Sequence, residues 1–352
     1  MNDRKITTIV FDGGDTLIKV DPQYSGKMKN WPELIAVPDA QQILKELSNH
    51  FQIFVASNAE DSNAQDVSEA MLRVGLNDYI QQYFTVNELG TKKPDLSFYK
   101  NLCAELQKSP EEIIMIGDDY HNDILPALMI GIHTIWFNPK NLVATAHLPL
   151  QEMECFSLNE IPDIVNSSPL PDYQTSLGWY MQQGATHTLL AHVNMVAAAS
   201  YQLSIWLKSQ GIEISPLLAH RGGLLHDLAK LKENGVESHA ILAKRMLEDL
   251  GQPELAKIAG HHLIGDLSSN NSKPNTWEEK VVNYCDKLTE GSELVSLDER
   301  LEALKLRYPH FKEKIQKNTP KVKDLEAEIL APLGLSSEEA LQKLKKSLFN
   351  KN

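Results

Sequence analysis

Histidine and aspartate residues gather in the second half of the chain, in motifs that could bind metal ions. Seven of the 12 histidines lie between positions 187 and 262. Asp227 and Asp286 fall within largely apolar segments, where a carboxylate is rarely buried without a partner. Neutral imidazoles and carboxylates bind Fe, Mn, Co, Ni or Zn, so a divalent cation is the partner that explains them. The candidate ligands are His192, His226, Asp227, His239, His261, His262 and Asp286.

The number of these candidates indicates two metal ions rather than one. They exceed what a single octahedral ion binds alongside water, whereas two ions bridged by Asp227 would use about that many. Two ions roughly 3.5–4 Å apart can share a hydroxide nucleophile and hold a phosphate group. Lys230 follows Asp227 by one helical turn, where its ammonium group would stabilise the negative charge of a reacting phosphoester.

Strand-like segments of the first half end in residues that could bind phosphate or a hard cation. In an open parallel sheet the carboxyl ends of the strands form the ligand crevice. A carboxylate there can coordinate a cation or attack phosphorus, while hydroxyl and amine groups bind phosphate oxygens. This inventory suits Mg²⁺-assisted phosphoryl transfer. It comprises Asp12 after Ile6–Phe11, Ser57 and Asn58 after Phe51–Ala56, Lys93 in a loop, and Asp118, Asp119 and Asp123 after Ile113–Ile116.

The elements that must position these residues change type near the middle of the chain. Up to about residue 160, strand-like segments, including Thr134–Phe137, alternate with helical patterns, which predicts parallel βαβ units. These helices are expected at Ala40–Leu47, Ala64–Val74 and Leu96–Leu106. From about residue 178 onward only helices are predicted. They are expected at Leu189–Leu207, Pro216–Leu231, Ser238–Leu250, Pro253–His262, Trp277–Thr289 and, after a capping box at Ser336–Glu339, Ala340–Phe349.

We therefore predict a Rossmann-like α/β domain with a parallel sheet, followed by an all-α domain. The α/β domain is expected at residues 1–165 and a turn-rich linker at 166–180. The helical metal domain is expected at 181–305 and a C-terminal helical extension at 306–352.

Four motifs of the first half occur in the order found in haloacid dehalogenase-like hydrolases, which this region resembles. The resemblance implies that Asp12 is a nucleophile forming an aspartyl-phosphate, and that Ser57 and Lys93, with Asn58 beside them, bind the phosphoryl group. It also implies a Mg²⁺ site formed by Asp12 and Asp118 together with Asp119 or Asp123. The motifs are Phe11-Asp12-Gly-Gly-Asp-Thr16-Leu17, Val55-Ala-Ser57-Asn58, Lys93-Pro94-Asp95 and Ile116-Gly117-Asp118-Asp119 through Asp123.

One residue departs from this family pattern. Phosphatases of the family usually carry a second aspartate two residues after the nucleophile, serving as general acid and base, and here that position is Gly14. Gly14 can offer a carbonyl oxygen to the metal but cannot protonate a leaving group, a contribution of roughly 10²–10⁴ in rate. Asp15 and His121 are the candidates to replace it. The alternative is that this domain has become a non-catalytic lid or sensor.

The site of the first domain is expected to lack a cap domain. Only a short insert, Ile18–Pro38, separates the first strand from the next helix, and no cap-sized segment lies between Ser57 and Lys93. Tyr24 and Trp31 in the insert could stack on a ligand, although a packed flap is the simpler interpretation.

The histidine and aspartate motifs of the second half resemble the HD-domain phosphohydrolases, specifically their His-Asp-Ile-Gly type. His192, His226-Asp227 and Asp286 match the four ligands that define the superfamily. His239 and His261-His262 match the additional ligands of its dinuclear members, and Lys230 matches a phosphate-facing base. Leu228-Ala229 replaces the common Ile-Gly. His187 is a rival to His192 as the first ligand.

These resemblances imply a bifunctional phosphohydrolase. The HD-type domain would bind two divalent transition metals, Mn, Fe, Ni or Co, and hydrolyse a phosphoester of a nucleotide, a cyclic phosphate or a cyclic dinucleotide. The first domain would be a Mg²⁺-dependent phosphatase acting on the resulting monoester. A redox alternative is a di-iron oxygenase, since some HD-type sites hold mixed-valent iron.

The composition of the chain limits its expected binding partners and its expected cellular location. The formal net charge of −13 argues against a general nucleic-acid binder. Residues 301–352 contain eleven basic against seven acidic residues, so an RNA end remains a candidate partner beside a small phosphorylated substrate. Apolar runs are too short to span a bilayer. The three scattered cysteines suit a reducing cytoplasm, which is the expected location.

Overall fold

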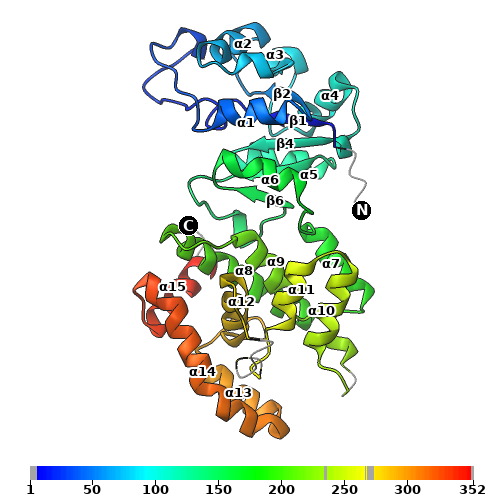
Figure 1. Ribbon diagram of the computed structural model, residues 1–352, viewed down its shortest axis with the longest axis vertical. Coiled ribbons are helices and arrows are strands. Elements are labelled where there is room, and N and C mark those ends of the chain that lie inside the picture. The colour runs from blue at the N-terminus through cyan, green and yellow to red at the C-terminus, as the bar shows by residue number, and fades with distance from the viewer. Residues whose placement is uncertain (1–5, 234–235, 266, 268–272, 350–352) are drawn as a thin grey trace. The chain divides into compact units, whose positions relative to one another are not determined.

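The computed structural model describes residues 6–233, 236–265, 267 and 273–349. It consists of two compact units (Figure 1). The first comprises Met1–Leu142 and Leu150–Pro169, and the second comprises Val143–Pro149 and Leu170–Asn352. In the part of the chain that the structure describes, no helix is both long enough and apolar enough to cross a membrane.

The first unit is built on a six-stranded, entirely parallel sheet of order β3-β2-β1-β4-β5-β6. In its register Phe11 pairs with both Val55 and Ile116. The four strands expected from the sequence are confirmed, and β3 and β6 are additional edge strands whose three residues are too few to show a pattern. The strands are β1 (Thr8–Phe11), β2 (Gln52–Ala56), β3 (Gln82–Phe84), β4 (Ile113–Gly117), β5 (His133–Phe137) and β6 (Met153–Cys155).

Helices cover both faces of this sheet because alternate strand residues are apolar on both sides. Ile9 and Phe11 pack in a core with α1 (Ala40–Leu47), α2 (Ala64–Arg73) and α6 (Ile161–Asn166). Val10 points to the other core, with α3 (Val86–Leu89), α4 (Leu96–Leu106) and α5 (Leu125–Met129). The predicted α/β class is therefore confirmed.

The chain order of the strands creates a crevice beside β1. From β1 the chain proceeds to β2 and β3 on one side, and then returns to place β4 on the other side. Ligands of open α/β sheets bind where the strand order reverses, at the carboxyl ends of the strands. Asp12 follows β1 and Asp118 follows β4, so both lie at this point.

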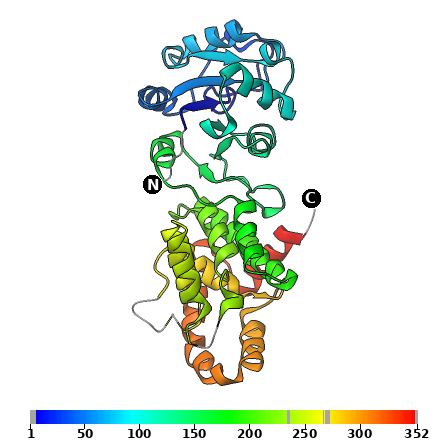
Figure 2. The ribbon, with the colours of Figure 1, turned by 90° about the vertical axis from the view of Figure 1, so that its right-hand side faces the viewer.

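The second unit is largely helical, as expected. Its only strands in the described residues are the two-residue β7 (Thr289–Glu290) and β8 (Glu293–Leu294). Its helices are α7 (Tyr173–Gln182), α8 (His187–Ser209), α9 (Pro216–Leu225), α10 (His239–Asp249), α11 (Pro253–Gly260), α12 (Trp277–Lys287), α13 (Leu297–Arg307), α14 (Lys312–Leu330) and α15 (Ser337–Phe349). A 90° turn of the ribbon shows α13 and α14, in orange, still side by side (Figure 2).

Helix α8 is the centre of this unit because it is buried on two sides. Val193 and Ala197 belong to a core with α9, α10 and α11. Val196 and Leu203 belong to a second core with α12, α13, α14 and α15. A helix that is apolar around most of its circumference is positioned by packing rather than by propensity.

A glycine allows α9 to approach α8 closely. A Cβ atom added to Gly223 would lie 2.9 Å from Ala197 Cα and 3.1 Å from the Val196 carbonyl carbon. These neighbours are backbone atoms, so they cannot move aside as a flexible side chain would. The close approach brings the end of α9, where His226 begins the next turn, near His192 on α8.

Helix α9 ends six residues before the Leu231 expected from the sequence. We attribute the early end to His226, whose Nδ1 lies 2.7 Å from the Gly223 carbonyl oxygen. In a continuing α-helix that oxygen would accept a hydrogen bond from the Asp227 amide. The imidazole ring therefore competes with the helix for this acceptor. The chain then turns through i to i−3 hydrogen bonds, from Leu228 to Leu225 and from Lys230 to Asp227.

Residues Val143–Pro149, which connect β5 to β6, belong to the second unit. The buried Arg221 donates to the carbonyl oxygens of Pro149, at 2.8 Å, and Pro171, at 2.7 Å. His147 Nε2 lies 2.7 Å from Gln202 Oε1 on α8. Helix α7 begins at Tyr173, within the segment 166–180 expected to be a linker. The four segment bounds expected from the sequence remain a prediction.

We predict that Gly223→Ala destabilises the second unit by about 1–3 kcal/mol, because the added methyl group overpacks the contact of α9 with α8. The measurement is denaturant unfolding of the full chain followed by circular dichroism.

Gly178→Ala on α7 is the matched control. No atom lies within 4 Å of the Cβ it would add, so this change is expected to be neutral or to stabilise by about 0.5–1 kcal/mol. Equal unfolding midpoints for the two variants would contradict the packing argument.

Two candidate active sites

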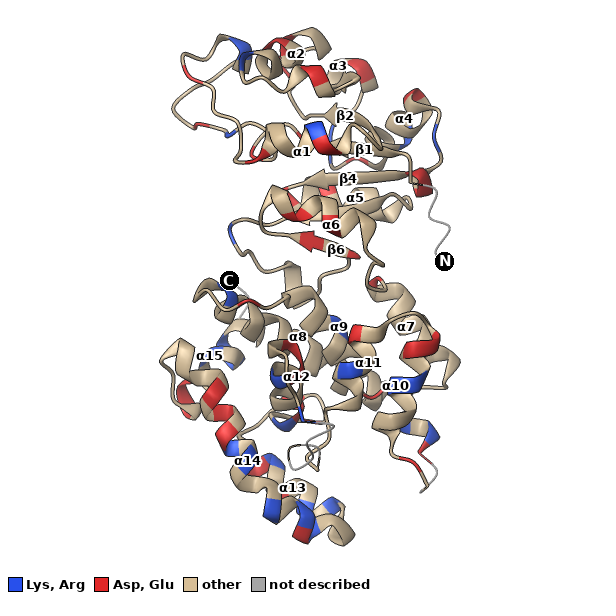
Figure 3. Ribbon diagram, viewed as in Figure 1, with Lys and Arg blue, Asp and Glu red and all other residues tan. Residues whose placement is uncertain are grey.

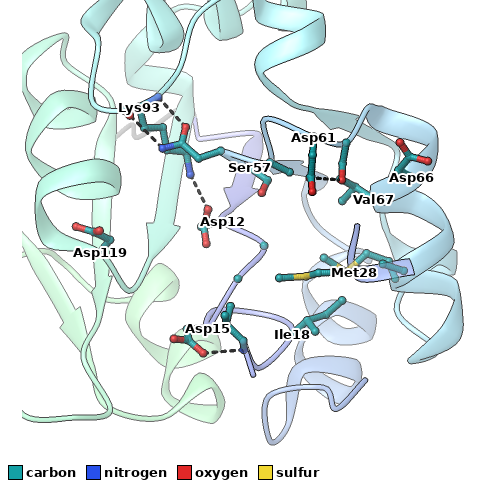
Figure 4. Close-up of a pocket in the computed structure, with 18 of the residues that line it drawn as sticks. Asp12, Asp15, Ile18, Met28, Ser57, Asp61, Asp66, Val67, Lys93 and Asp119 are labelled. Carbon is teal, nitrogen blue, oxygen red and sulfur yellow. Dashed lines mark hydrogen bonds and ion pairs between the residues drawn. The ribbon is translucent and has the colours of Figure 1, made fainter. Parts of the chain in front are cut away.

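The crevice of the first unit brings together three predicted carboxylates. Oxygen atoms of Asp12, Asp118 and Asp123 lie within 4.8 Å of one another. Lys93, itself buried, places Nζ 2.7 Å from Asp12 Oδ1 and 2.7 Å from Asp123 Oδ1 (Figure 4). Ser57 lines the same cavity of about 440 Å³.

The positions of Asp118 and Asp123 depend on neighbours that the sequence did not single out. Thr16 Oγ1 donates to Asp118 Oδ1 at 3.3 Å and accepts from the Asp118 amide at 3.1 Å. A Cβ atom at Gly117 would lie 2.3 Å from Asp123 Oδ2, so only glycine leaves room for that carboxylate. Thr16 and Gly117 both occur in the motifs quoted above, but nothing in their spacing indicates these contacts.

The side chains of Asp119 and Asn58 bind nearby backbone groups and do not belong to the cluster of carboxylate oxygens. Asp119 Oδ1 accepts from the amides of His121 and Asn122, at 2.9 and 3.0 Å, and Figure 4 shows its side chain apart from Asp12. Asn58 bonds to both the amide and the carbonyl of Lys93, at 2.8 and 3.0 Å. Asn58 therefore fixes the backbone that carries the lysine.

The electrostatics of this crevice favour a bound cation. Burial, followed by the negative charges of Asp12 and Asp15, raises the pKa of Asp118 to about 6. Carboxylates crowded in this way are stabilised in the charged form by a divalent cation, and oxygen donors are what Mg²⁺ prefers. The donor set therefore fits Mg²⁺.

Among the described residues, Asp15 does not take the place of the acid that is missing at Gly14. Asp15 Oδ1 accepts from the Val20 amide at 2.9 Å, and its Oδ2 lies 3.6 Å from Lys140 Nζ. Figure 4 shows this carboxylate turned away from Asp12.

The insert Ile18–Pro38 packs as a flap: Lys27 and Lys29 pair with Asp66 at 2.6 and 2.7 Å.

The second unit brings three of the predicted histidines to one buried carboxylate, Asp227, and a fourth, His192, to Asp286. His226 Nε2 lies 3.7 Å from its Oδ2, whereas His239 Nε2 and His262 Nε2 lie 3.1 and 3.5 Å from its Oδ1. His226 Nε2, the neighbour of Oδ2, also faces Asp286 Oδ1 at 3.8 Å, and His192 Nε2 lies 3.3 Å from the same Asp286 oxygen. The two oxygens of Asp227 thus face two groups of donors, the arrangement a bridging carboxylate requires.

The same ring nitrogen of each histidine faces this centre, because the other one is held by an oxygen atom. Nδ1 lies 3.1 Å from the Gly291 carbonyl for His192, 2.7 Å from the Gly223 carbonyl for His226, and 2.6 Å from the Ala259 carbonyl for His262. A carbonyl oxygen can only accept, so each Nδ1 carries the proton and each Nε2 keeps its lone pair. This is the tautomer that binds a metal through Nε2.

Several polar atoms at the centre have no hydrogen-bond partner among the described residues. They include the buried His226 Nε2 and Asp227 Oδ1. His239 Nε2 and His262 Nε2 lie only 3.1 Å apart. Nδ1 of His239 lies 3.3 Å from Glu233 and donates to it, so Nε2 of His239 also carries a lone pair. Two lone pairs therefore face each other. Burial lowers the pKa of His226 to about 3 and also lowers that of His262. Neutral rings with facing lone pairs fit divalent metal ions.

His261 and His187 lie outside both donor groups in the described structure. His261 Nδ1 is bound to the buried Glu279 at 2.9 Å, and His187 is exposed in the first turn of α8. His261 remains a predicted ligand without a place in either group. Lys230 lies at the edge of the centre, with Nζ 3.2 Å from His239 Nε2 and 3.6 Å from Asp227 Oδ1.

Two cations that the sequence did not single out hold Asp286. Lys287 Nζ lies 3.0 Å from its Oδ2, and an Arg300 nitrogen lies 3.8 Å from its Oδ1. Lys287 adjoins Asp286, but Arg300 comes from α13, and no local signal links the two. The centre opens into a cavity of about 480 Å³.

We predict that His262→Asn lowers the transition-metal content by about one ion per chain, because it removes a donor from the group around Asp227 Oδ1. The content is measured by elemental analysis after reconstitution and removal of loosely bound metal.

His261→Asn is the matched control at the adjacent position and should retain the wild-type metal content. An equal loss in both variants would show that His261 is a ligand in solution.

Comparisons with known proteins agree with this division of the chain. Residues 10–137 match the haloacid dehalogenase-like hydrolase family and residues 189–291 match the HD domain family. An uncharacterized protein of Methanocaldococcus jannaschii is 28% identical over 39% of this chain and 83% of its own length. A ribulose-1,5-bisphosphate 5-phosphatase of Halopiger xanaduensis is 32% identical over 36% of this chain and 51% of its own length.

A glyceraldehyde 3-phosphate phosphatase of Pyrococcus furiosus is 28% identical over 37% of this chain. The chain spans about half the length of these two phosphatases, 51% and 52%. Both matched families include hydrolases of phosphoesters. The chain carries a haloacid dehalogenase-like hydrolase domain at residues 10–137, followed by an HD domain at residues 189–291.

Proposed function

We propose that this protein is a bifunctional metal-dependent phosphohydrolase, with the HD domain as its principal catalyst. The observation that supports the proposal is the common orientation of the histidines around Asp227: each binds an oxygen atom through Nδ1 and directs Nε2 at the centre. A helical core does not need this arrangement for its stability, whereas a dinuclear metal site does.

In the HD domain the two donor groups would hold two divalent transition metals, Mn, Fe, Ni or Co. Such ions, when bound, supply a hydroxide nucleophile near neutral pH and neutralise phosphate charge. Asp227 would orient both ions, and the Nδ1 hydrogen bonds would keep the imidazoles from rotating. Lys230, at 3.6 Å from Asp227, would bind a phosphate oxygen and stabilise the charge that develops as the ester bond breaks.

We propose a nucleotide-like substrate for this domain: a nucleotide, a cyclic phosphate or a cyclic dinucleotide. Five cations against three carboxylates line its cavity among the described residues, and this excess suits a phosphorylated ligand. The cations are Lys230, Lys287, Arg300, Arg307 and Lys314, and the carboxylates are Asp227, Glu233 and Asp286.

In the first domain Asp12 would attack phosphorus through a carboxylate oxygen and release the alcohol of a monoester. Lys93, 2.7 Å from Asp12, and Ser57 would bind the phosphoryl oxygens, and water would then hydrolyse the aspartyl-phosphate. Mg²⁺ held by Asp12, Asp118 and Asp123, with the Gly14 carbonyl, would stabilise the phosphoryl charge. The names of the two phosphatase relatives support a small phosphate monoester as substrate.

A slower or purely sensing first domain is the second candidate. It is favoured by the contacts of Asp15, which bind its carboxylate to the Val20 amide and near Lys140 instead of the nucleophile. Without a nearby acid, the domain would hydrolyse esters with good leaving groups and act slowly on others.

We place these activities in the cytoplasm. Cys103, Cys155 and Cys285 are all free and buried, as expected for a protein that is not stabilised by disulfides.

We predict that His226→Ala lowers hydrolysis of bis(p-nitrophenyl) phosphate with added Mn²⁺ by at least about 100-fold, because it removes a donor at the shared centre. His187→Ala is the matched control and should keep the wild-type rate. Unchanged turnover in His226→Ala would refute the hydrolase assignment of this domain. Oxygen consumption with a mixed-valent iron signal in the wild type would instead favour the oxygenase.

We predict that Asp12→Asn abolishes Mg²⁺-dependent hydrolysis of p-nitrophenyl phosphate without slowing diester hydrolysis, because a neutral amide is a far weaker nucleophile than a carboxylate oxygen. With a diester substrate, the monoester product should then accumulate, as followed by chromatography. A first domain that is inert in the wild type as well would support the sensing role.

A further inference from the structure

The cavity of the HD domain is lined partly by residues that lie beyond the HD family match. The match ends at residue 291, whereas Arg300, Leu304, Arg307, Tyr308, Phe311, Lys314 and Ile315 all line the cavity. They come from α13, from its C-cap Tyr308, from the turn Pro309–Phe311, and from the start of α14. This helix pair therefore supplies a wall that the metal-binding core does not contain.

Basic and acidic side chains alternate along this helix pair (Figure 3), but the charged residues of the pair that line the cavity are all basic: Arg300, Arg307 and Lys314. Glu290 pairs with both Arg300 and Arg307 and so ties α13 to the strand that follows α12. Arg300 is only 7% exposed, and its buried Nε has no hydrogen-bond partner in the described residues. A buried guanidinium with an unused donor, at the edge of a metal centre, suits an anionic oxygen of a ligand.

Lys314 is held against the loop that follows His262. A Cβ atom at Gly265 would lie 2.4 Å from Lys314 Nζ, so the ammonium group rests directly on the glycine backbone. The loop and the helix thereby present a cation at the cavity.

Two aromatic rings complete this wall. Tyr308 is 38% exposed and Phe311 is 56% exposed, and neither stacks on another ring among the described aromatic residues. Ligand pockets are lined mainly by apolar and aromatic side chains, and exposed rings at the edge of a charged cavity offer a surface of that kind. A planar heteroaromatic ring can stack on such rings while its phosphate reaches the cations.

We propose that α13 and α14 form the recognition wall of the HD domain and that this wall selects phosphoesters carrying a nucleobase. Arg307 and Lys314 bind phosphate oxygens of the substrate, while Tyr308 and Phe311 stack on the base. The inference rests on the proposed hydrolase function of this domain and specifies which part of the chain reads the substrate.

The test measures binding to the full chain with Mn²⁺ by calorimetry. The probes are the phosphonate isosteres of AMP and of ribose 5-phosphate, in which a methylene group replaces the ester oxygen, so that neither is hydrolysed. The two differ at C1 of the ribose, which carries adenine in one and a hydroxyl group in the other. We expect the wild type to bind the AMP isostere at least about tenfold more tightly, as base stacking predicts.

The variant Tyr308→Ala/Phe311→Ala should reduce this preference to less than about threefold, and Arg307→Ala should weaken both probes alike. Tyr308→Leu/Phe311→Leu keeps apolar volume but lacks rings, so it should also lose the preference. Leu306→Ala is the matched control, since Leu306 is on α13, is 83% exposed and does not line the cavity.

A preference that survives in both double variants, or its absence in the wild type, would overturn the proposal. A change of oligomeric state in the double variants with unchanged binding would overturn it in favour of a docking surface. Binding is independent of turnover, so the two proposals fail separately. Loss of base preference without any hydrolysis by the wild type would uphold the wall but refute the hydrolase.

Discussion

The HD domain is organised around the burial of one carboxylate. Asp227 is 4% exposed and faces imidazole nitrogens on both of its oxygens. A buried anion beside neutral rings is costly unless positive charge compensates it. Helices α8, α9, α10, α11 and α12, or the turns that follow them, each bring a donor to this point. The packing of the unit is therefore inseparable from the cations that it would hold.

Two of the histidine rings in this centre are oriented by the ends of helices. His226 and His262 both follow the last turn of a helix, and each returns its Nδ1 to a carbonyl three residues earlier. The side chain thus ends the helix and fixes its own ring in a single contact. This explains why His262 faces the centre, whereas the adjacent His261 points to Glu279. Sequence identifies such a pair, but the φ and ψ angles at the helix end decide which member points inward.

The fold class, the four central strands and the ligand types could be predicted because they depend on local periodicity and residue chemistry. Contacts between distant segments could not. Arg300 reaches Asp286 from the next helix, and Thr16 reaches Asp118 across 102 positions. The choice between Asp119 and Asp123 was also left open by the motif. Asp119 caps the following turn, whereas Gly117 leaves space for Asp123 beside Lys93.

The loop Val143–Pro149 changes what a domain boundary means in this protein. These seven residues belong to the helical unit, although the strands before and after them belong to the sheet. The polypeptide therefore passes from one unit to the other three times rather than once. Cutting the gene at the apparent junction near Pro169 would strip Arg221 of its Pro149 acceptor and Gln202 of His147. Evolutionary shuffling of either half as an independent cassette would face the same obstacle.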